Sequence, residues 1–267
     1  MRRIVALLDK ELADLRGNPA VFVPAILTGV VSIVMPFVIA IAVPYFSGER
    51  LADSSDFRIA AEMYQSQPAT RSLDPEGAIQ AMIFQQFLIL LVLTPVAGAM
   101  SIAAYAVVGE KQARTLEPLL ATPITTFELL AAKILAALVP GVVLVAACFA
   151  LYVAGVIAFA HPGVYRTLFF PRALLTIFLL GPLAALAALQ MAVCVSSRVN
   201  DARSAQQIGA LVILPISALL VAQFTNNVQL TSRVVILISS GMAALNLVLM
   251  VIAIGLFDRE SILTRWK

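Results

Sequence analysis

The chain has 267 residues, of which 61% are hydrophobic and only 12% are charged. An ordinary soluble domain is about 45–50% apolar and about 25% charged, so this composition excludes a soluble globular domain and indicates an integral membrane protein. The formal net charge is only +3 at pH 7, and the basic residues follow membrane topology, so no nucleic-acid partner is expected.

The first 19 residues predict a separate amphipathic helix. Its apolar positions recur at spacings of four, four and three, which is one face of a helix, and they are Ile4, Leu8, Leu12 and Leu15. Charged residues occupy the other faces, and Gly17-Asn18-Pro19 supplies a helix stop. We expect this helix to lie in the cytoplasmic membrane interface, and its leucines suit either lipid anchoring or protein docking.

Residues 20–267 predict a transmembrane domain of six helices. A helix needs about 20 apolar residues to cross a hydrocarbon core of about 30 Å, and six stretches are this long. Runs so uniformly apolar fit helices rather than barrel strands, so the expected fold is all-α. The spans are predicted at residues 21–43, 82–108, 129–160, 173–196, 208–224 and 234–257. Five of them contain a proline that should bend the axis, namely Pro36, Pro95, Pro140, Pro182 and Pro215.

An external polar segment, about residues 47–76, separates the first two spans. At its end, Asp74-Pro75-Glu76 predicts an N-cap, a first-turn proline and an acid favoured by the helix dipole. The second helix should then run from Pro75 to about Glu110, a length of roughly 54 Å that exceeds the hydrocarbon core.

The distribution of basic residues predicts the orientation. Of the 18 Lys and Arg residues, 12 lie at the two termini and in the second-to-third and fourth-to-fifth loops, and six lie on the opposite side. Both termini are therefore expected in the cytoplasm, with the first span as an uncleaved signal-anchor.

The spans contain little that suggests intrinsic chemistry. No Asp, Glu, Lys, Arg or His lies at the centre of a predicted span, whereas ion-coupled transporters usually carry such residues at depth. Cys148 and Cys194 both lie in apolar helix and are expected to be buried hydrophobes rather than a disulfide or metal pair.

The cytoplasmic loop of about residues 110–128 combines charges, helix caps and leucines. Thr115 can cap a short helix in which Leu116, Leu119 and Leu120 share one face. Thr122-Pro123 ends that helix, and Thr125-x-x-Glu128 forms a capping box that opens the third span. A well-capped helical hairpin would explain the caps alone, but it would not explain apolar residues in a loop that faces water.

This loop resembles the cytoplasmic loop of type 2 ABC transporter permeases, particularly permeases of the sodium-extrusion and nitrous-oxide-reductase-maturation types. The resemblance implies that the short helix is a coupling helix that docks on a separate ATP-binding subunit, and that residues 1–19 form the connecting helix beside it. The implied ATPase-coupling residues are Glu110, Lys111, Arg114, Thr115, Leu116, Glu117, Leu119, Leu120, Thr122, Pro123 and Glu128.

The same resemblance implies a bacterial cytoplasmic membrane, a second permease copy, two ATPase subunits and a pathway lined by the second and fifth spans. The pathway candidates are Gln85, Gln86, Thr94 and Gln223. The chain has no Gly-x-x-x-x-Gly-Lys-Ser/Thr phosphate loop, so ATP and Mg²⁺ are expected on the partner rather than on this chain. The alternatives are a secondary transporter or channel, and a membrane scaffold or maturation factor. The substrate and the direction of transport stay open.

Overall fold

A computed structural model describes residues 2–17, 19–53, 70, 73–112, 125–196, 207–208, 210–224 and 230–256. Within these ranges every regular element is helical, as the composition predicts. The α-helices are α1 (Arg2–Gly17), α2 (Val23–Phe37), α3 (Val43–Ser47), α5 (Pro75–Leu91), α6 (Leu93–Gln112), α8 (Thr126–Phe159), α9 (Pro171–Leu175), α10 (Gly181–Ser196), α12 (Ile213–Phe224) and α13 (Ser232–Leu256).

Short 3₁₀ and π segments connect or interrupt these helices. The 3₁₀ turns are η1 (Pro19–Phe22), η3 (Leu51–Asp53), η4 (Val164–Phe169) and η6 (Ala210–Val212). The π segments are η2 (Val38–Ala42) and η5 (Thr176–Leu180), which lie next to Pro36 and Pro182. Since a proline removes one backbone donor, a widened turn nearby is a common way to keep the remaining bonds.

Five helical stretches are long and apolar enough to cross a membrane. They are Val23–Ser47, Pro75–Ala103, Phe127–Phe159, Pro171–Val195 and Ser232–Leu256. The remaining predicted span corresponds to η6 and α12, whose apolar part, Ala210–Leu219, is shorter. Residues 210–224 cover roughly 22 Å at the rise of a helix, less than a hydrocarbon core. The described part of the chain thus confirms five spans, and a sixth stays a prediction.

The predicted second helix consists of two segments. α5 ends at Leu91, Val92 forms a turn in which its N–H donates to Ile89 O at 3.1 Å, and α6 begins at Leu93. The predicted helix from Pro75 to about Glu110 is therefore interrupted by a single turn residue, although Val92 keeps right-handed helical dihedral angles and Pro75–Ala103 forms one apolar stretch. The physical reason is Pro95, which lacks the N–H that would bond to the carbonyl of Leu91.

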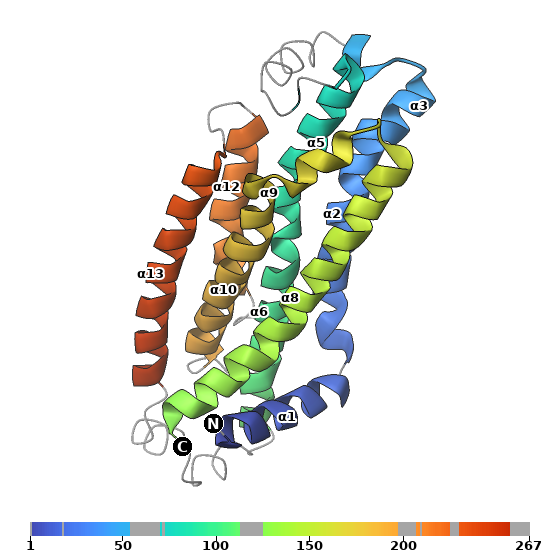
Figure 1. The fold of residues 1–267 in the computed structure, drawn as a ribbon. Coiled ribbons are helices and arrows are strands. Elements are labelled where there is room, and N and C mark those ends of the chain that lie inside the picture. Colours follow the sequence, from blue (N-terminus) through green and yellow to red (C-terminus); the bar gives the residue numbers. More distant parts are fainter. Residues whose placement is uncertain are drawn as a thin grey trace.

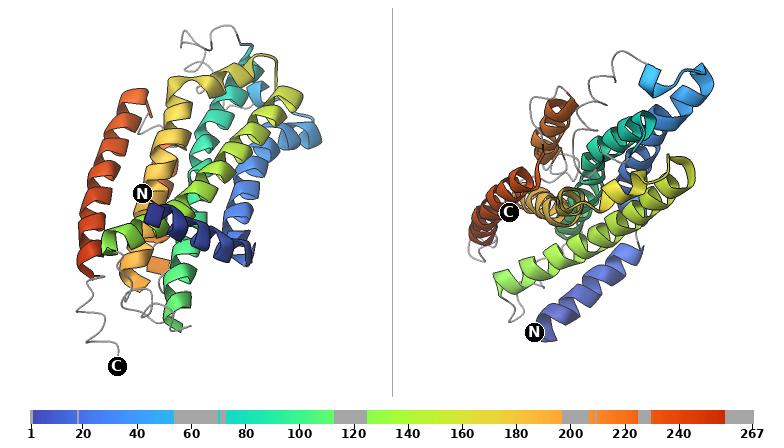
Figure 2. Two further views of the ribbon diagram at one scale, coloured as in Figure 1. Left: turned by 60° about the horizontal axis from the view of Figure 1, so that its bottom comes forward. Right: turned by 45° about the horizontal axis from the view of Figure 1, so that its top comes forward.

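α6 and α10 lie at the centre of the bundle, with α2 and α8 on one side and α12 and α13 on the other (Figure 1). One hydrophobic core surrounds α6 and α10, and includes Val96, Ala99, Ala184 and Ala188. A second core joins α5 to the C-terminal half of α8 and to η4. α1 does not run along the bundle axis. It lies across one end of the bundle, alongside the beginning of α8 (Figure 2).

Candidate functional site

One end of the bundle gathers α1, the end of α6 and the beginning of α8 (Figure 1). α6 ends at Gln112 and α8 begins at Thr126, so both neighbours of the predicted coupling segment belong to packed helices. Glu110 and Lys111 lie in the last turns of α6, with side chains that are not described. The other predicted coupling residues up to Pro123 lie outside the described residues, namely Arg114, Thr115, Leu116, Glu117, Leu119, Leu120, Thr122 and Pro123.

The capping box at the start of α8 is confirmed. Glu128 N–H donates to Thr125 Oγ1 at 3.2 Å, and Thr125 N–H donates to Glu128 Oε2 at 2.9 Å. Two backbone donors that have no partner inside the helix are thereby satisfied. The capping box therefore fixes the start of α8 at Thr125, near the end of the predicted coupling loop.

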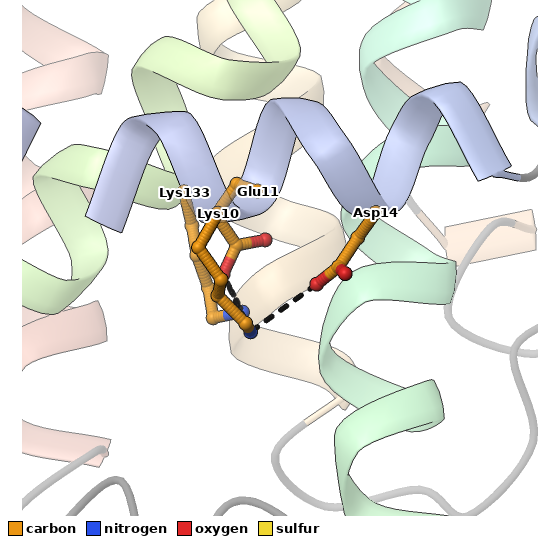
Figure 3. Close-up of polar contacts among 4 residues, drawn as sticks. All are labelled: Lys10, Glu11, Asp14 and Lys133. Carbon is orange, nitrogen blue, oxygen red and sulfur yellow. Dashed lines mark hydrogen bonds and ion pairs between the residues drawn. The ribbon is translucent and has the colours of Figure 1, made fainter. Parts of the chain in front are cut away.

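α1 is held against α8 by an ion pair that the sequence patterns did not predict. Lys133 Nζ donates to Glu11 Oε1 at 2.9 Å (Figure 3), and both residues are buried. The same carboxylate also lies 3.4 Å from Lys10 Nζ, and Lys10 Nζ lies 3.4 Å from Asp14 Oδ2. The sequence does contain a signal, because Glu11 follows Leu8 by three residues and precedes Leu15 by four, on the apolar face of the helix.

The apolar face of α1 packs partly against the protein. Leu7 is buried, and Leu15 packs against the core around α6 and α10. Leu8 and Leu12 are half-buried. The choice between lipid anchoring and protein docking for this face stays a prediction.

Two of the four pathway candidates are buried inside the protomer. Gln85 Nε2 donates to Thr167 O at 3.0 Å, and Gln85 Oε1 accepts from Arg172 Nη2. Thr94 is fully buried beside Gly29, where α6 meets α2, and its hydroxyl has no hydrogen-bond partner among the described residues. Both side chains thus contribute to contacts within one protomer.

For the other two pathway candidates, the described part of the chain gives no side-chain hydrogen bond. Gln86 is half-buried on α5, on the face next to that of Gln85. Gln223 lies in the last turn of α12, and its side chain is not described. A role of any of these four residues in a pathway stays a prediction.

The opposite end of the bundle has an open cavity of about 350 Å³, lined by residues of α3 and the turn that follows it, of the N-terminal part of α5 and of the turn after α8. Asp74 caps α5 as predicted, because its Oδ1 accepts from Gly77 N–H at 3.2 Å, and its Oδ2 lies 3.2 Å from His161 Nδ1. Glu76 accepts from the N–H groups of Leu51 and Ala52 at 3.3 and 3.0 Å. These bonds hold the segments that follow the first and third spans against the second.

The described residues offer no evident metal centre, because no three His, Cys, Asp or Glu side chains among them are grouped to hold an ion. Cys148 and Cys194 are not joined in a disulfide. At one end of the bundle, an ion pair therefore joins α1 to α8 near the predicted coupling loop. At the other end, hydrogen bonds join short connecting segments to α5.

A family model described as ABC-2 family transporter protein matches residues 59–264. This match covers the predicted coupling loop and every helix from α5 to α13. No curated protein matches the chain.

Proposed function

The chain belongs to the ABC-2 family of transporter proteins, and on that premise we propose that it is the membrane subunit of an ATP-driven exporter in the bacterial cytoplasmic membrane. It is a multi-pass membrane protein and an ABC permease by family and by its apolar helices. The exporter direction, the copy numbers and the orientation are part of the proposal.

The observation that carries the proposal is that the helices on both sides of the predicted coupling loop (about residues 110–128) belong to the packed bundle. The central part of that loop is residues 113–124. These residues connect α6, which lies at the centre of the bundle, to α8, a helix of 34 residues that crosses its whole length. A partner that moves this segment would act on both helices. Its sequence supports a docking role, because Leu116, Leu119 and Leu120 are apolar residues in a loop that would otherwise face water.

We place the energy source on a separate subunit. ATP with Mg²⁺ would bind between two ATPase subunits, and each of these would dock on the 113–124 segment of one permease copy. Closure of the ATPase pair would then move two permease copies between inward-open and outward-open states by rigid-body motion. The chain itself needs no cofactor for this cycle, and surrounding lipid would cover its outer faces.

The orientation follows from charge. By the predicted topology, 12 of the 18 Lys and Arg residues belong to the two termini and to the loops on the same side as α1, and basic loops remain preferentially in the cytoplasm. This orientation would bring α1 and the coupling loop within reach of a cytoplasmic ATPase. The cavity beside Asp74 and His161 would then open on the outer side.

The test is co-purification of the tagged chain with an ATP-binding subunit from native membranes. We expect the wild type to retain the subunit, and a variant with Leu119→Asp and Leu120→Asp to lose it while accumulating normally in the membrane. The matched control is Leu119→Met with Leu120→Met, which keeps the docking face apolar and should retain the partner.

Two results would argue against the proposal. A wild-type chain that repeatedly purifies alone would indicate a secondary transporter, a channel or a scaffold. An unchanged ATPase level in the double aspartate variant would show that the coupling segment is not the docking site.

A further inference from the structure

Glu11 and Lys133 form a buried ion pair between two elements that are far apart in sequence. Lys133 Nζ lies 2.9 Å from Glu11 Oε1, and the two side chains are 3% and 7% exposed. Leu7, one turn before Glu11, is buried as well, and α1 runs alongside the first turns of α8 (Figure 3). α1 therefore lies along α8 and is joined to it by one directional bond.

The energetics of such a pair favour a role in positioning. Both charges lose their hydration on burial, and two apolar residues of similar size commonly stabilise a fold as well or better. An ion pair, however, is satisfied only when the two groups meet, so it selects one register of α1 on α8. Lys10 also contacts Glu11, but Lys10 is 40% exposed and its attraction is screened by water.

The pair lies on the route between the coupling segment and the first span. Lys133 follows Thr125, the N-cap of α8, by eight residues, which is about 12 Å along a helix. On the other side, α1 leads through η1 into α2. A displacement of the start of α8 would therefore reach α2 through α1 only if α1 cannot slide on α8.

We propose that Glu11 and Lys133 are positioning residues for energy coupling: their ion pair makes α1 move as one body with the start of α8, and so carries the motion of segment 113–124 to the first span as well as to the third. This inference rests on the proposed function. It concerns a bond within one chain, so its structural part can be tested on the permease alone.

The structural test measures the distance between α1 and α8 with spin labels. The labels replace Asp9 and Phe127, which are both exposed, in a chain whose Cys148 and Cys194 are changed to Ala. We expect one narrow distance distribution in the wild type and in Lys10→Met, and a broad one in Lys133→Met and in Glu11→Gln. A narrow, unchanged distribution in both single variants would overturn the proposal.

The functional test measures MgATP hydrolysis by the permease and its co-purified ATPase in lipid nanodiscs, relative to the ATPase alone. We expect stimulation to fall by about five-fold or more in Lys133→Met, which is within the range of single-residue effects on coupling between sites. Lys10→Met, the control that removes an exposed lysine from the same carboxylate, should hydrolyse ATP like the wild type. The charge swap Glu11→Lys with Lys133→Glu should restore stimulation.

The remaining outcomes are also decisive. Where the single variants do not accumulate, Glu11→Leu with Lys133→Met leaves no unpaired buried charge, and we expect it to bind the ATPase but to show weak stimulation. Normal stimulation in that variant, or no rescue by a stably folded charge swap, would overturn the role of the ion pair. A wild type that binds no ATPase overturns the proposed function instead, and the spin-label distances then still report whether the pair fixes α1.

Discussion

Gly98 of α6 and Ala25 of α2 lie in direct contact, since a Cβ atom added to Gly98 would come within 3.1 Å of Ala25 Cβ. One turn away, Gly29 packs against Thr94 and Cys148 in the same way. Further along α2, Ser32 Oγ donates to Leu90 O at 2.9 Å. Small residues thus let the first span approach the second closely, which is a common basis for helix packing in membranes.

A leucine at position 98 should separate these two helices. Gly98→Leu adds a side chain where even a methyl group is tight, and we expect a loss of stability of about 1–3 kcal/mol, the usual cost of overpacking. The measurement is the midpoint of thermal unfolding in detergent. Gly241→Leu on α13 is the control, because a Cβ there would meet no atom within 4 Å. Equal shifts in the two variants would contradict close packing at Gly98.

Tyr152 should stabilise the second core, between α5 and α8, in two separable ways. It is fully buried, its ring contacts Phe37 and Phe84, and its hydroxyl donates to Phe84 O at 2.8 Å. Tyr152→Phe removes only the hydrogen bond and should cost about 1 kcal/mol. Tyr152→Ala also removes the ring and should cost about 3–5 kcal/mol. Denaturant titration of purified protein would measure both, and equal losses would show that the ring contacts add nothing.

The capping box should hold the first turn of α8. Thr125→Ala removes the side-chain acceptor of Glu128 N–H, and we expect this turn to lose about 1 kcal/mol of local stability. Hydrogen exchange of the amides of residues 126–130 measures the effect directly. Thr125→Ser retains the hydroxyl and should exchange like the wild type. Exchange in Thr125→Ala as slow as in the wild type would mean that tertiary contacts alone hold this turn.

Gln80 should fix the turn after α8 at the end of the bundle opposite α1. Its Oε1 accepts from His161 N–H at 2.8 Å, and Gln80 is buried. Gln80→Leu keeps a side chain of similar size but removes the acceptor. Because His161 is half-buried and water can replace part of the bond, we expect a local loss of about 0.5–1.5 kcal/mol.

Hydrogen exchange across residues 161–170 would detect this change. Gln86→Leu, on the neighbouring face of α5, is the matched control and should leave exchange in the turn unaltered. A response to Gln86→Leu as large as the response to Gln80→Leu would assign the effect to α5 as a whole.

Local signals in the sequence determined much of this protein. Membrane class, the positions of five spans, the N-cap at Asp74 and the capping box at Thr125 depend on residues within a few positions of one another, and the structure confirms them. The interruption at Val92 could also have been predicted, because Pro95 removes a specific backbone donor. The apolar pattern, however, continues through this point without a change.

Only the tertiary structure decided which polar side chains meet. Glu11 and Lys133 are 122 residues apart, and Gln85 and Thr167 are 82 residues apart. Each of these side chains suits many partners, and hydropathy and helical periodicity do not distinguish among them. The choice comes from how whole helices pack, because a buried charge or amide is stable only where the bundle brings a matching group within hydrogen-bond distance.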